Sequence, residues 1–306
     1  MNLYVNVSFE VLTGNNCLES EFDIFAGEAQ AAPILASARD LLGADPHALP
    51  DAARYENRAG QILCVARALA AAACLAPAAG CVVAGYSVGE VAAWGVAGFW
   101  SFEQTLRLTA LRAELMDAAG GDAGGLGFVR GLERGHVEAL AAQFDCALAI
   151  VNPRQSFVIG GPRDRVEQCC AAALAQGAAA ARRIGVNVAS HTPLLAGAVA
   201  PFRAVLQATP LSRPMPGRVL VGAATASVVA GAPGLAGLAA QIGTTLDWAA
   251  VLDSLIERGV DRVLELGPGS ALAEMAHTAY PALDVRALDD FRSLAGAAAW
   301  MRRDAG

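Results

Sequence analysis

Residues 81–90 decide the fold, and their sequence is Cys-Val-Val-Ala-Gly-Tyr-Ser-Val-Gly-Glu. The apolar run at 81–84 predicts a short buried strand, and the Ser-Val-Gly-Glu step after it predicts the start of a helix. Gly85 and Gly89 bracket Ser87 in a G-x-S-x-G pattern. Small residues on both sides of a serine permit a strained turn that lifts its hydroxyl out at the head of a helix. The stretch therefore predicts an α/β fold with a nucleophilic serine at residue 87.

Strands and helices alternate on both sides of this turn. Residues 3–12 alternate apolar and polar side chains as a strand does, and Thr-Gly-Asn-Asn at 13–16 predicts a turn. Further strands are expected at 219–222 and 262–266, and helices at 26–42, 61–75, 102–118 and 248–258. With 306 residues available, this alternation predicts one large α/β domain and a smaller one attached or inserted.

The inserted part follows a glycine-rich break at 120–125. Strands are expected there at 126–132, 147–152, 156–159 and 180–188, and helices at 137–143 and 163–176. The order strand-helix-strand-strand-helix-strand is that of a split βαβ, ferredoxin-like unit. We therefore expect residues 125–188 to form a small ferredoxin-like subdomain, and 1–124 with 189–306 to form the main domain.

Composition excludes several function classes. All 22 basic residues are arginine, which excludes Schiff-base chemistry on lysine and phosphate loops that need a Gly-Lys step. The net charge is −7 and no run of basic residues occurs, which argues against a nucleic-acid surface. Apolar stretches such as 62–81 are interrupted by Arg67, and the N-terminus lacks the pattern of a leader. We expect a cytoplasmic protein with no membrane span.

The seven cysteines do not form a recognisable site. They include no Cys-x-x-Cys, and no histidine lies at metal-ligand spacing from them. They are expected to be buried thiols in a reducing compartment, with no metal.

A nucleophilic serine needs a base, and the chain has four histidines. His47 lies in a proline-flanked loop and His136 begins a charged helix, so both are expected at the surface. His277 lies in a late helix, where an exposed or structural histidine is expected. His191 follows the strand that returns from the subdomain, so it can face Ser87 across a cleft.

Several motifs occur in a fixed order along the chain. They are Gly-Tyr-Ser-Val-Gly-Glu at 85–90, Leu-Thr-Ala-Leu-Arg-Ala-Glu-Leu-Met at 108–116, Asn-Pro-Arg-Gln at 152–155, Val-Ile-Gly-Gly at 158–161, Val-Ala-Ser-His at 188–191 and Glu-Leu-Gly-Pro-Gly at 265–269. In this order they resemble the malonyl-CoA:acyl carrier protein transacylases and the related acyltransferase domains of polyketide synthases. The resemblance runs from about residue 3 to 288. It implies an α/β-hydrolase-like large domain with a parallel sheet and an inserted ferredoxin-like subdomain.

The resemblance also implies roles for three side chains. Ser87 corresponds to the acyl-accepting serine, and His191 to its base, whose ring is oriented by a backbone carbonyl. Arg112 corresponds to the arginine that pairs with the free carboxylate of a malonyl or methylmalonyl group, which a guanidinium grips through two parallel bonds. From the residues alone, Arg112 would instead form an ion pair on the helix surface with Glu114 or Asp117.

Two loops complete the implied site. The Val88 amide is expected to bind the oxyanion, together with an amide from the turn Gly14-Asn15-Asn16, where Asn15 replaces the glutamine of the family's Gly-Gln-Gly loop. The loop that orients the histidine is expected to include Thr244 and Asp247. An acidic side chain close to His191 would raise the pKa of the imidazole.

The implied activity is transfer of a malonyl group from coenzyme A to the phosphopantetheine thiol of an acyl carrier protein, through a malonyl-serine and without a metal or cofactor. Tyr86 replaces the more usual histidine, a variation associated with malonate decarboxylase transacylase subunits. Fatty-acid synthesis and a polyketide line served in trans are equally open. Two alternatives stay open. One is a thioester hydrolase on the same Ser-His dyad, and the other is a degenerate, non-catalytic partner, suggested by the altered loop at 14–16.

Overall fold

The main sheet of the protein is built around the strand that precedes Ser87. The computed structural model describes residues 2–6, 22–76, 80–120 and 123–302. The strands of this sheet, in spatial order, are β11 (Asp284–Ala287), β10 (Arg262–Glu265), β1 (Asn2–Asn6), β2 (Val82–Gly85), β7 (Val219–Gly222) and β8 (Ser227–Val228). The first five run parallel, and the short β8 pairs antiparallel to β7. The expected parallel sheet is confirmed.

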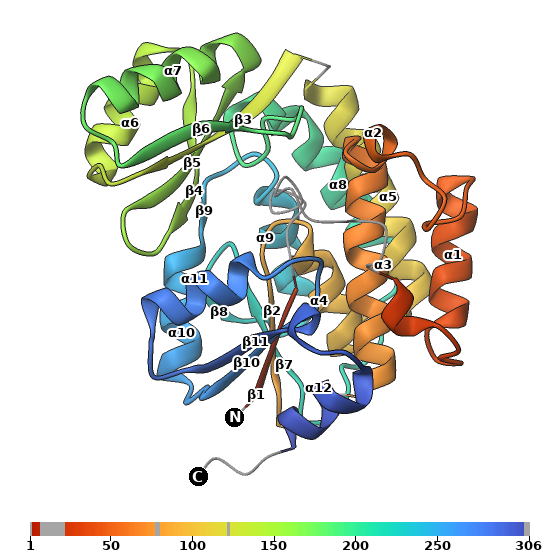
Figure 1. Cartoon of the computed structure of the whole chain (residues 1–306). Coiled ribbons are helices and arrows are strands. Elements are labelled where there is room, and N and C mark those ends of the chain that lie inside the picture. Colours follow the sequence, from red (N-terminus) through yellow and green to blue (C-terminus); the bar gives the residue numbers. More distant parts are fainter. Residues whose placement is uncertain (1, 7–21, 77–79, 121–122, 303–306) are drawn as a thin grey trace.

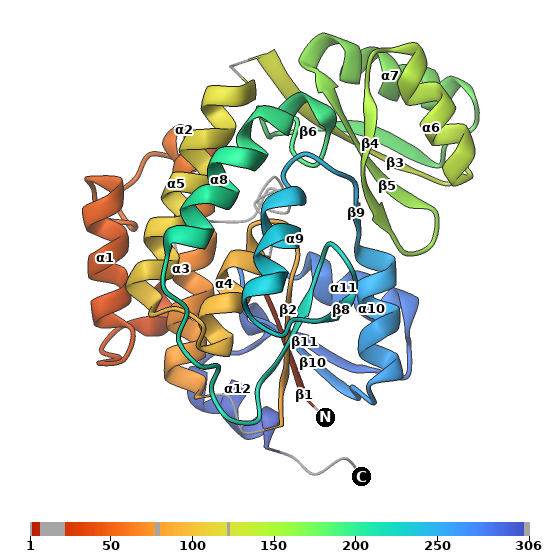
Figure 2. The same ribbon diagram turned by 180° about the vertical axis from the view of Figure 1, so that it is seen from behind.

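Helices cover this sheet and bury it (Figures 1 and 2). They are α1 (Ala32–Leu42), α2 (Asp51–Arg54), α3 (Asn57–Leu75), α4 (Gly89–Ala97), α5 (Phe102–Gly120), α8 (Ala196–Ala208), α9 (Leu235–Ala240), α10 (Trp248–Glu257), α11 (Ala271–Ala279) and α12 (Leu294–Met301). In both views α3, α5 and α8 lie side by side, with α1 outside them, while α10 and α11 lie on the other side. Because parallel strands need both faces covered, this layering follows from the sheet.

Helix α3 is the centre of the core. Among the described residues it is the one helix long and apolar enough to cross a membrane, but 72% of that window is buried inside the fold. Its apolar face and its small side chains, such as Ala66, Ala68 and Ala70, all have exposed fractions near zero. It is therefore a core helix of a folded domain.

A second sheet stands apart from the first (Figure 1). Its spatial order is β6 (Ala180–Ile184), β3 (Gly124–Arg130), β5 (Ser156–Pro162), β4 (Ala147–Asn152) and β9 (Leu246–Asp247). The first four strands are antiparallel neighbours, in the order of a ferredoxin-like unit, and α6 (Arg134–Gln143) and α7 (Arg163–Ala175) connect them. The two-residue strand β9 pairs parallel to β4 and comes from the later part of the chain. The division at 124/125 and 188/189 stays a prediction.

Some expected elements differ in extent. The helix expected at 26–42 begins only at Ala32, where Pro33 occupies its first turn, a position that proline favours. The strand expected at 180–188 ends at Ile184, before Gly185. Helix α8 was not expected, because Pro201 lies inside it and proline normally interrupts a helix. The end of the strand at 3–12 and the turn at 13–16 lie outside the described residues.

Candidate active site

Ser87 occupies a strained turn between β2 and α4. Its φ is +53°, in the left-handed region that non-glycine residues rarely adopt. A Cβ atom placed on Gly85 would lie 2.1 Å from the backbone carbonyl carbon of Gly89, so the turn closes only with glycine at 85. The serine is therefore presented at the head of α4, as the G-x-S-x-G pattern predicts.

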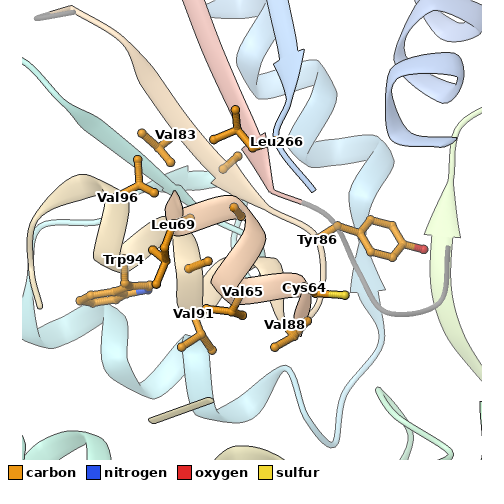
Figure 3. Packing of buried hydrophobic residues seen from close by; sticks show 14 of the residues in the cluster. Cys64, Val65, Leu69, Val83, Tyr86, Val88, Val91, Trp94, Val96 and Leu266 are labelled. Atoms are coloured by element: carbon orange, nitrogen blue, oxygen red, sulfur yellow. The ribbon is translucent and has the colours of Figure 1, made fainter. Parts of the chain in front are cut away.

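Buried apolar side chains pack against this turn and hold it in place. Val88 and Val91 pack with Cys64 and Val65 of α3 in one buried cluster (Figure 3). Tyr86 belongs to the same cluster, but its ring points away from these four side chains and packs edge-on against Trp248, with ring centroids 5.3 Å apart. The residue that replaces the family's usual histidine is thus part of the packing between the turn and α10.

Ser87 and His191 meet at hydrogen-bond distance. Ser87 Oγ lies 2.7 Å from His191 Nε2, and the two side chains, 6% and 0% exposed, are buried. His191 lies in the connection between β6 and the 3₁₀ helix Pro193–Leu195, and its own φ is +61°. Two residues in sparsely populated backbone conformations therefore face each other, as is common where a site is held in place by its surroundings.

The His191 ring is held by the backbone of Gln241. Its Nδ1 donates to the Gln241 carbonyl oxygen at 2.5 Å, and its backbone N–H donates to the Ile242 carbonyl at 2.8 Å. Because a carbonyl can only accept, the proton of the neutral ring is on Nδ1, and Nε2 is free to accept the Ser87 proton.

Thr244 and Asp247, which were expected to orient His191, form hydrogen bonds with other groups. Thr244 Oγ1 donates to the Ala240 carbonyl, and Asp247 accepts from the Ala250 N–H as the N-cap of α10. The prediction of Thr244 and Asp247 as orienting residues was wrong, because the acceptor is the backbone carbonyl of Gln241, three residues before Thr244 and six before Asp247. A carbonyl cannot be recognised from the residue type.

The electrostatics of the pair favour a neutral base. Burial first, and the Arg112 charge second, lower the pKa of His191 to about 3, against a smaller raising effect of the Gln241 carbonyl. Asp247 is not among the groups that shift this pKa, and its carboxylate caps α10 instead. At neutral pH the imidazole is unprotonated and available as a base.

Arg112 lies inside the protein, on α5. It is 1% exposed, and its Nη1 donates to Gln61 Oε1 of α3 at 2.5 Å. Glu114 is bound instead by Arg58, at 2.8 Å. The alternative of an ion pair on the helix surface is therefore wrong for Arg112.

One small pocket contains both the serine and the arginine. The space that a water-sized molecule can occupy in it is about 10 Å³. Its lining residues are Asn57, Gln61, Ser87, Val88, Arg112, Met116, Val186 and Ser190. This volume is near the least that one water molecule needs, so the serine and the arginine line a narrow pocket.

The expected oxyanion donors can be placed only in part. The Val88 N–H lies at the start of α4 and donates to no acceptor within 22–76, 80–120 and 123–302. A helix N-terminus with a spare N–H favours negative charge. Asn15 lies outside the described residues.

The remaining candidates fall elsewhere. His47, His136 and His277 are exposed, as expected. Within the described part of the chain, no group of three or more His, Cys, Asp or Glu side chains is placed to hold a metal ion. Gln61, which the sequence analysis did not single out, was detectable as a polar residue at the start of an otherwise apolar helix.

Comparison with known proteins decides the family. Residues 61–227, more than half of the chain, match the model of the acyl transferase domain. The chain belongs to this family. As a family member it is similar to the polyketide biosynthesis protein ThaF of Burkholderia thailandensis, with 31% identity over 202 residues, 65% of this chain and 17% of ThaF. The malonyl CoA-acyl carrier protein transacylase of Salmonella typhimurium is 27% identical over 226 residues, 71% of each chain.

Solved structures share the fold along almost the whole chain. The acyl-carrier-protein S-malonyltransferase of Burkholderia pseudomallei has a TM-score of 0.85 and 25% identity, covering 97% of this acyl transferase and 99% of that chain. A malonyl-transacylase in complex with a type II polyketide acyl-carrier protein has a TM-score of 0.86 and 24% identity, covering 97% and 99%. By contrast, the chain spans less than a fifth of the length of ThaF.

Proposed function

We propose that this acyl transferase moves a malonyl group from coenzyme A to the phosphopantetheine thiol of an acyl carrier protein, through a malonyl ester on Ser87. The observation that carries the proposal is the 2.7 Å contact between Ser87 Oγ and His191 Nε2 beside a pocket that also holds the Arg112 guanidinium. A serine, a neutral base and a buried cation are what transfer of an acidic acyl group requires.

The first half-reaction loads the enzyme. His191 Nε2 takes the proton of Ser87 Oγ as the oxygen attacks the thioester carbonyl. The Val88 N–H and the start of α4 stabilise the tetrahedral oxyanion. When the carbon–sulfur bond breaks, the imidazolium gives its proton to the coenzyme A sulfur. The enzyme is left as the malonyl-serine ester with a neutral histidine.

The second half-reaction runs the same steps in reverse. The carrier thiol gives its proton to His191 Nε2, its sulfur attacks the ester carbonyl, and Ser87 Oγ leaves and recovers the proton. Every proton is returned, so the cycle uses malonyl-CoA as substrate and no bound cofactor or metal.

Arg112 gives the pocket its preference for an acidic acyl group. Its Nη1 is fixed by Gln61, which sets the plane of the guanidinium before substrate arrives. A buried cation is stabilised by an anionic partner, so a malonyl carboxylate is favoured over a neutral methyl group.

The similar proteins support the inferred partners, and the free cysteines support the inferred compartment. The similar proteins named above include malonyl CoA-acyl carrier protein transacylases, and one was solved with an acyl-carrier protein. We infer an acyl carrier protein and coenzyme A thioesters as partners, with no nucleic acid or membrane. The six cysteines among the described residues are free thiols, which fits the cytoplasm. The main domain at 1–124 and 189–306 and the subdomain at 125–188 would form the two walls of the cleft.

Incubation of the protein with malonyl-CoA and a holo carrier protein tests this function. The expected result is malonyl-carrier protein, measured by mass spectrometry, in molar excess over free malonate. Release of malonate without transfer would indicate the thioester hydrolase, and no turnover of malonyl-CoA at all would indicate a non-catalytic partner.

A further inference from the structure

Two buried polar side chains behind the dyad take no part in the steps above. Gln241 follows α9 and Glu90 lies in the first turn of α4, and each is 1% exposed. Gln241 Nε2 donates to Glu90 Oε2 at 2.7 Å and to the Ser87 carbonyl oxygen at 3.2 Å. The backbone carbonyl of the same glutamine accepts from His191 Nδ1.

We propose that Glu90 is a positioning residue for the dyad: its carboxylate fixes Gln241, whose backbone carbonyl aims His191 at Ser87. The inference rests on the proposed function, because it assigns a role within the same reaction. These hydrogen bonds form a closed ring. Ser87 Oγ bonds to His191, and His191 bonds to the carbonyl of Gln241. The side-chain amide of Gln241 bonds to Glu90 and to the backbone carbonyl of Ser87.

The ring joins three segments that are far apart in the sequence. The nucleophile lies at residue 87, its base at 191 and the orienting carbonyl at 241, so contacts between the segments set the distances between them. His191 also has a strained backbone, so its position depends on its partners. A shift of about 1 Å in such a pair can lower a rate about 100-fold.

The carboxylate of Glu90 also accepts a hydrogen bond from the strand β7 side of the site. The Ala223 N–H, just after β7, donates to its carboxylate, and a Cβ atom on Gly222 would lie 3.4 Å from Glu90 Oε1. Three donors, the Ala223 N–H, the Gln241 amide and the Trp94 side chain, therefore need acceptor oxygens at residue 90. A carboxylate supplies two, whereas an amide supplies one and places an NH₂ group against one of the donors.

The position of the carboxylate argues against a role in packing alone. A buried carboxylate costs free energy that an apolar side chain of the same size would avoid. Burial raises the pKa of Glu90 to about 7, and the hydrogen bonds from Ala223, Gln241 and Trp94 and the Arg112 charge act in the opposite direction. Glu265 provides a comparison, because it is equally buried but accepts from the Leu272 and Ala273 N–H groups at the start of α11 and contacts no member of the ring.

The test is an exchange of the two side chains. Glu90→Gln sets an NH₂ group against one of the donors to residue 90, and Gln241→Glu sets one carboxylate against another. The double exchange restores a donor facing an acceptor between residues 90 and 241 and keeps an acceptor for the Ala223 N–H, but the Ser87 carbonyl oxygen loses the amide donor of residue 241. The first-order rate constant for acylation by malonyl-CoA should fall about 10-fold in Glu90→Gln and about 100-fold in Gln241→Glu, with KM changed less than about threefold. The double exchange should recover to within about 10-fold of the wild type.

Two controls separate positioning from general damage. Glu265→Gln removes a matched buried carboxylate and should lower the melting temperature while changing the acylation rate less than Glu90→Gln does. If Gln241→Glu does not fold, Glu90→Asp replaces it: the carboxylate is kept but withdrawn by one methylene, and about a 10-fold loss of rate is expected.

The outcomes distinguish this inference from the proposed function. Single variants that acylate at the wild-type rate, or a double exchange no better than the worse single variant, would overturn the inference while acylation by the wild type leaves the function standing. If the wild type forms no acyl-enzyme, the proposed function fails. The inference is then decided by proton NMR of the His191 Nδ1–H, which should be far downfield in the wild type and in Glu265→Gln and absent in Glu90→Gln. Its persistence in Glu90→Gln would overturn the inference.

Discussion

Replacing Arg112 with alanine should change which acyl group the enzyme accepts. The guanidinium is 1% exposed and lines the pocket that contains Ser87, so a malonyl carboxylate bound there is desolvated. A hydrogen bond to a charged group contributes about 1.5–3 kcal/mol, and a tenfold change corresponds to about 1.4 kcal/mol. Loss of one or two such bonds predicts a fall in kcat/KM for malonyl-CoA of about 10- to 20,000-fold.

The effect should be confined to acidic acyl groups. Acetyl-CoA presents no carboxylate, so its kcat/KM should stay the same or rise once the buried cation is removed. Arg112→Lys should retain part of the malonyl preference, because the charge remains but the fork that bonds Gln61 and the carboxylate is lost.

The assay compares initial rates of transfer from malonyl-CoA and from acetyl-CoA for each variant. Arg107→Ala is the matched control: it removes an arginine from the same helix, but one that is 62% exposed and pairs with Glu103 on the surface. It should leave the malonyl-to-acetyl ratio unchanged. A ratio that is equally unchanged in Arg112→Ala would refute the assignment of Arg112 to the carboxylate.

Three further outcomes are expected. Gly85→Ala should lower the melting temperature strongly and abolish acylation, because its Cβ would lie 2.1 Å from the Gly89 backbone; a stable, active variant would refute the tight turn. The acylation rate should not fall with the midpoint near pH 6.5 of an ordinary histidine, because the pKa of His191 is lowered to about 3; a pH profile with that midpoint would contradict the buried neutral base. Burial raises the pKa of Glu265 to about 8, so its ionisation should destabilise the fold as the pH rises from about 4.5 through 8; urea unfolding of Glu265→Gln should show a flatter pH dependence than the wild type.

The proposed nucleophile and its proposed base were predictable because each has a local signature. Ser87 is flanked by glycines between an apolar strand and a helix, and His191 was the one histidine placed between the subdomain and the main domain. The structure brings both together with no change to the assignment. For short-range backbone requirements of this kind, the residue types alone indicate the conformation.

The orienting groups were less predictable because they act through the backbone or through the packing of distant helices. The acceptor for His191 is the carbonyl of Gln241, and any residue type can supply a carbonyl. The burial of Arg112 depends on how α3 packs on α5, which the sequence of α5 alone does not specify. Glu90 follows the G-x-S-x-G pattern directly, but its partners lie at 223 and 241, so its role is visible only in three dimensions.

The most direct test of the central claim is the mass of the protein after mixing with malonyl-CoA. The wild type should gain the mass of one malonyl group, and peptide mapping should place it on the Ser87 hydroxyl. Ser87→Ala should gain nothing, while Ser190→Ala, which changes another serine of the same pocket, should still be acylated. Acylation that persists in Ser87→Ala, or that maps to any other residue, would contradict the assignment of Ser87 as the nucleophile.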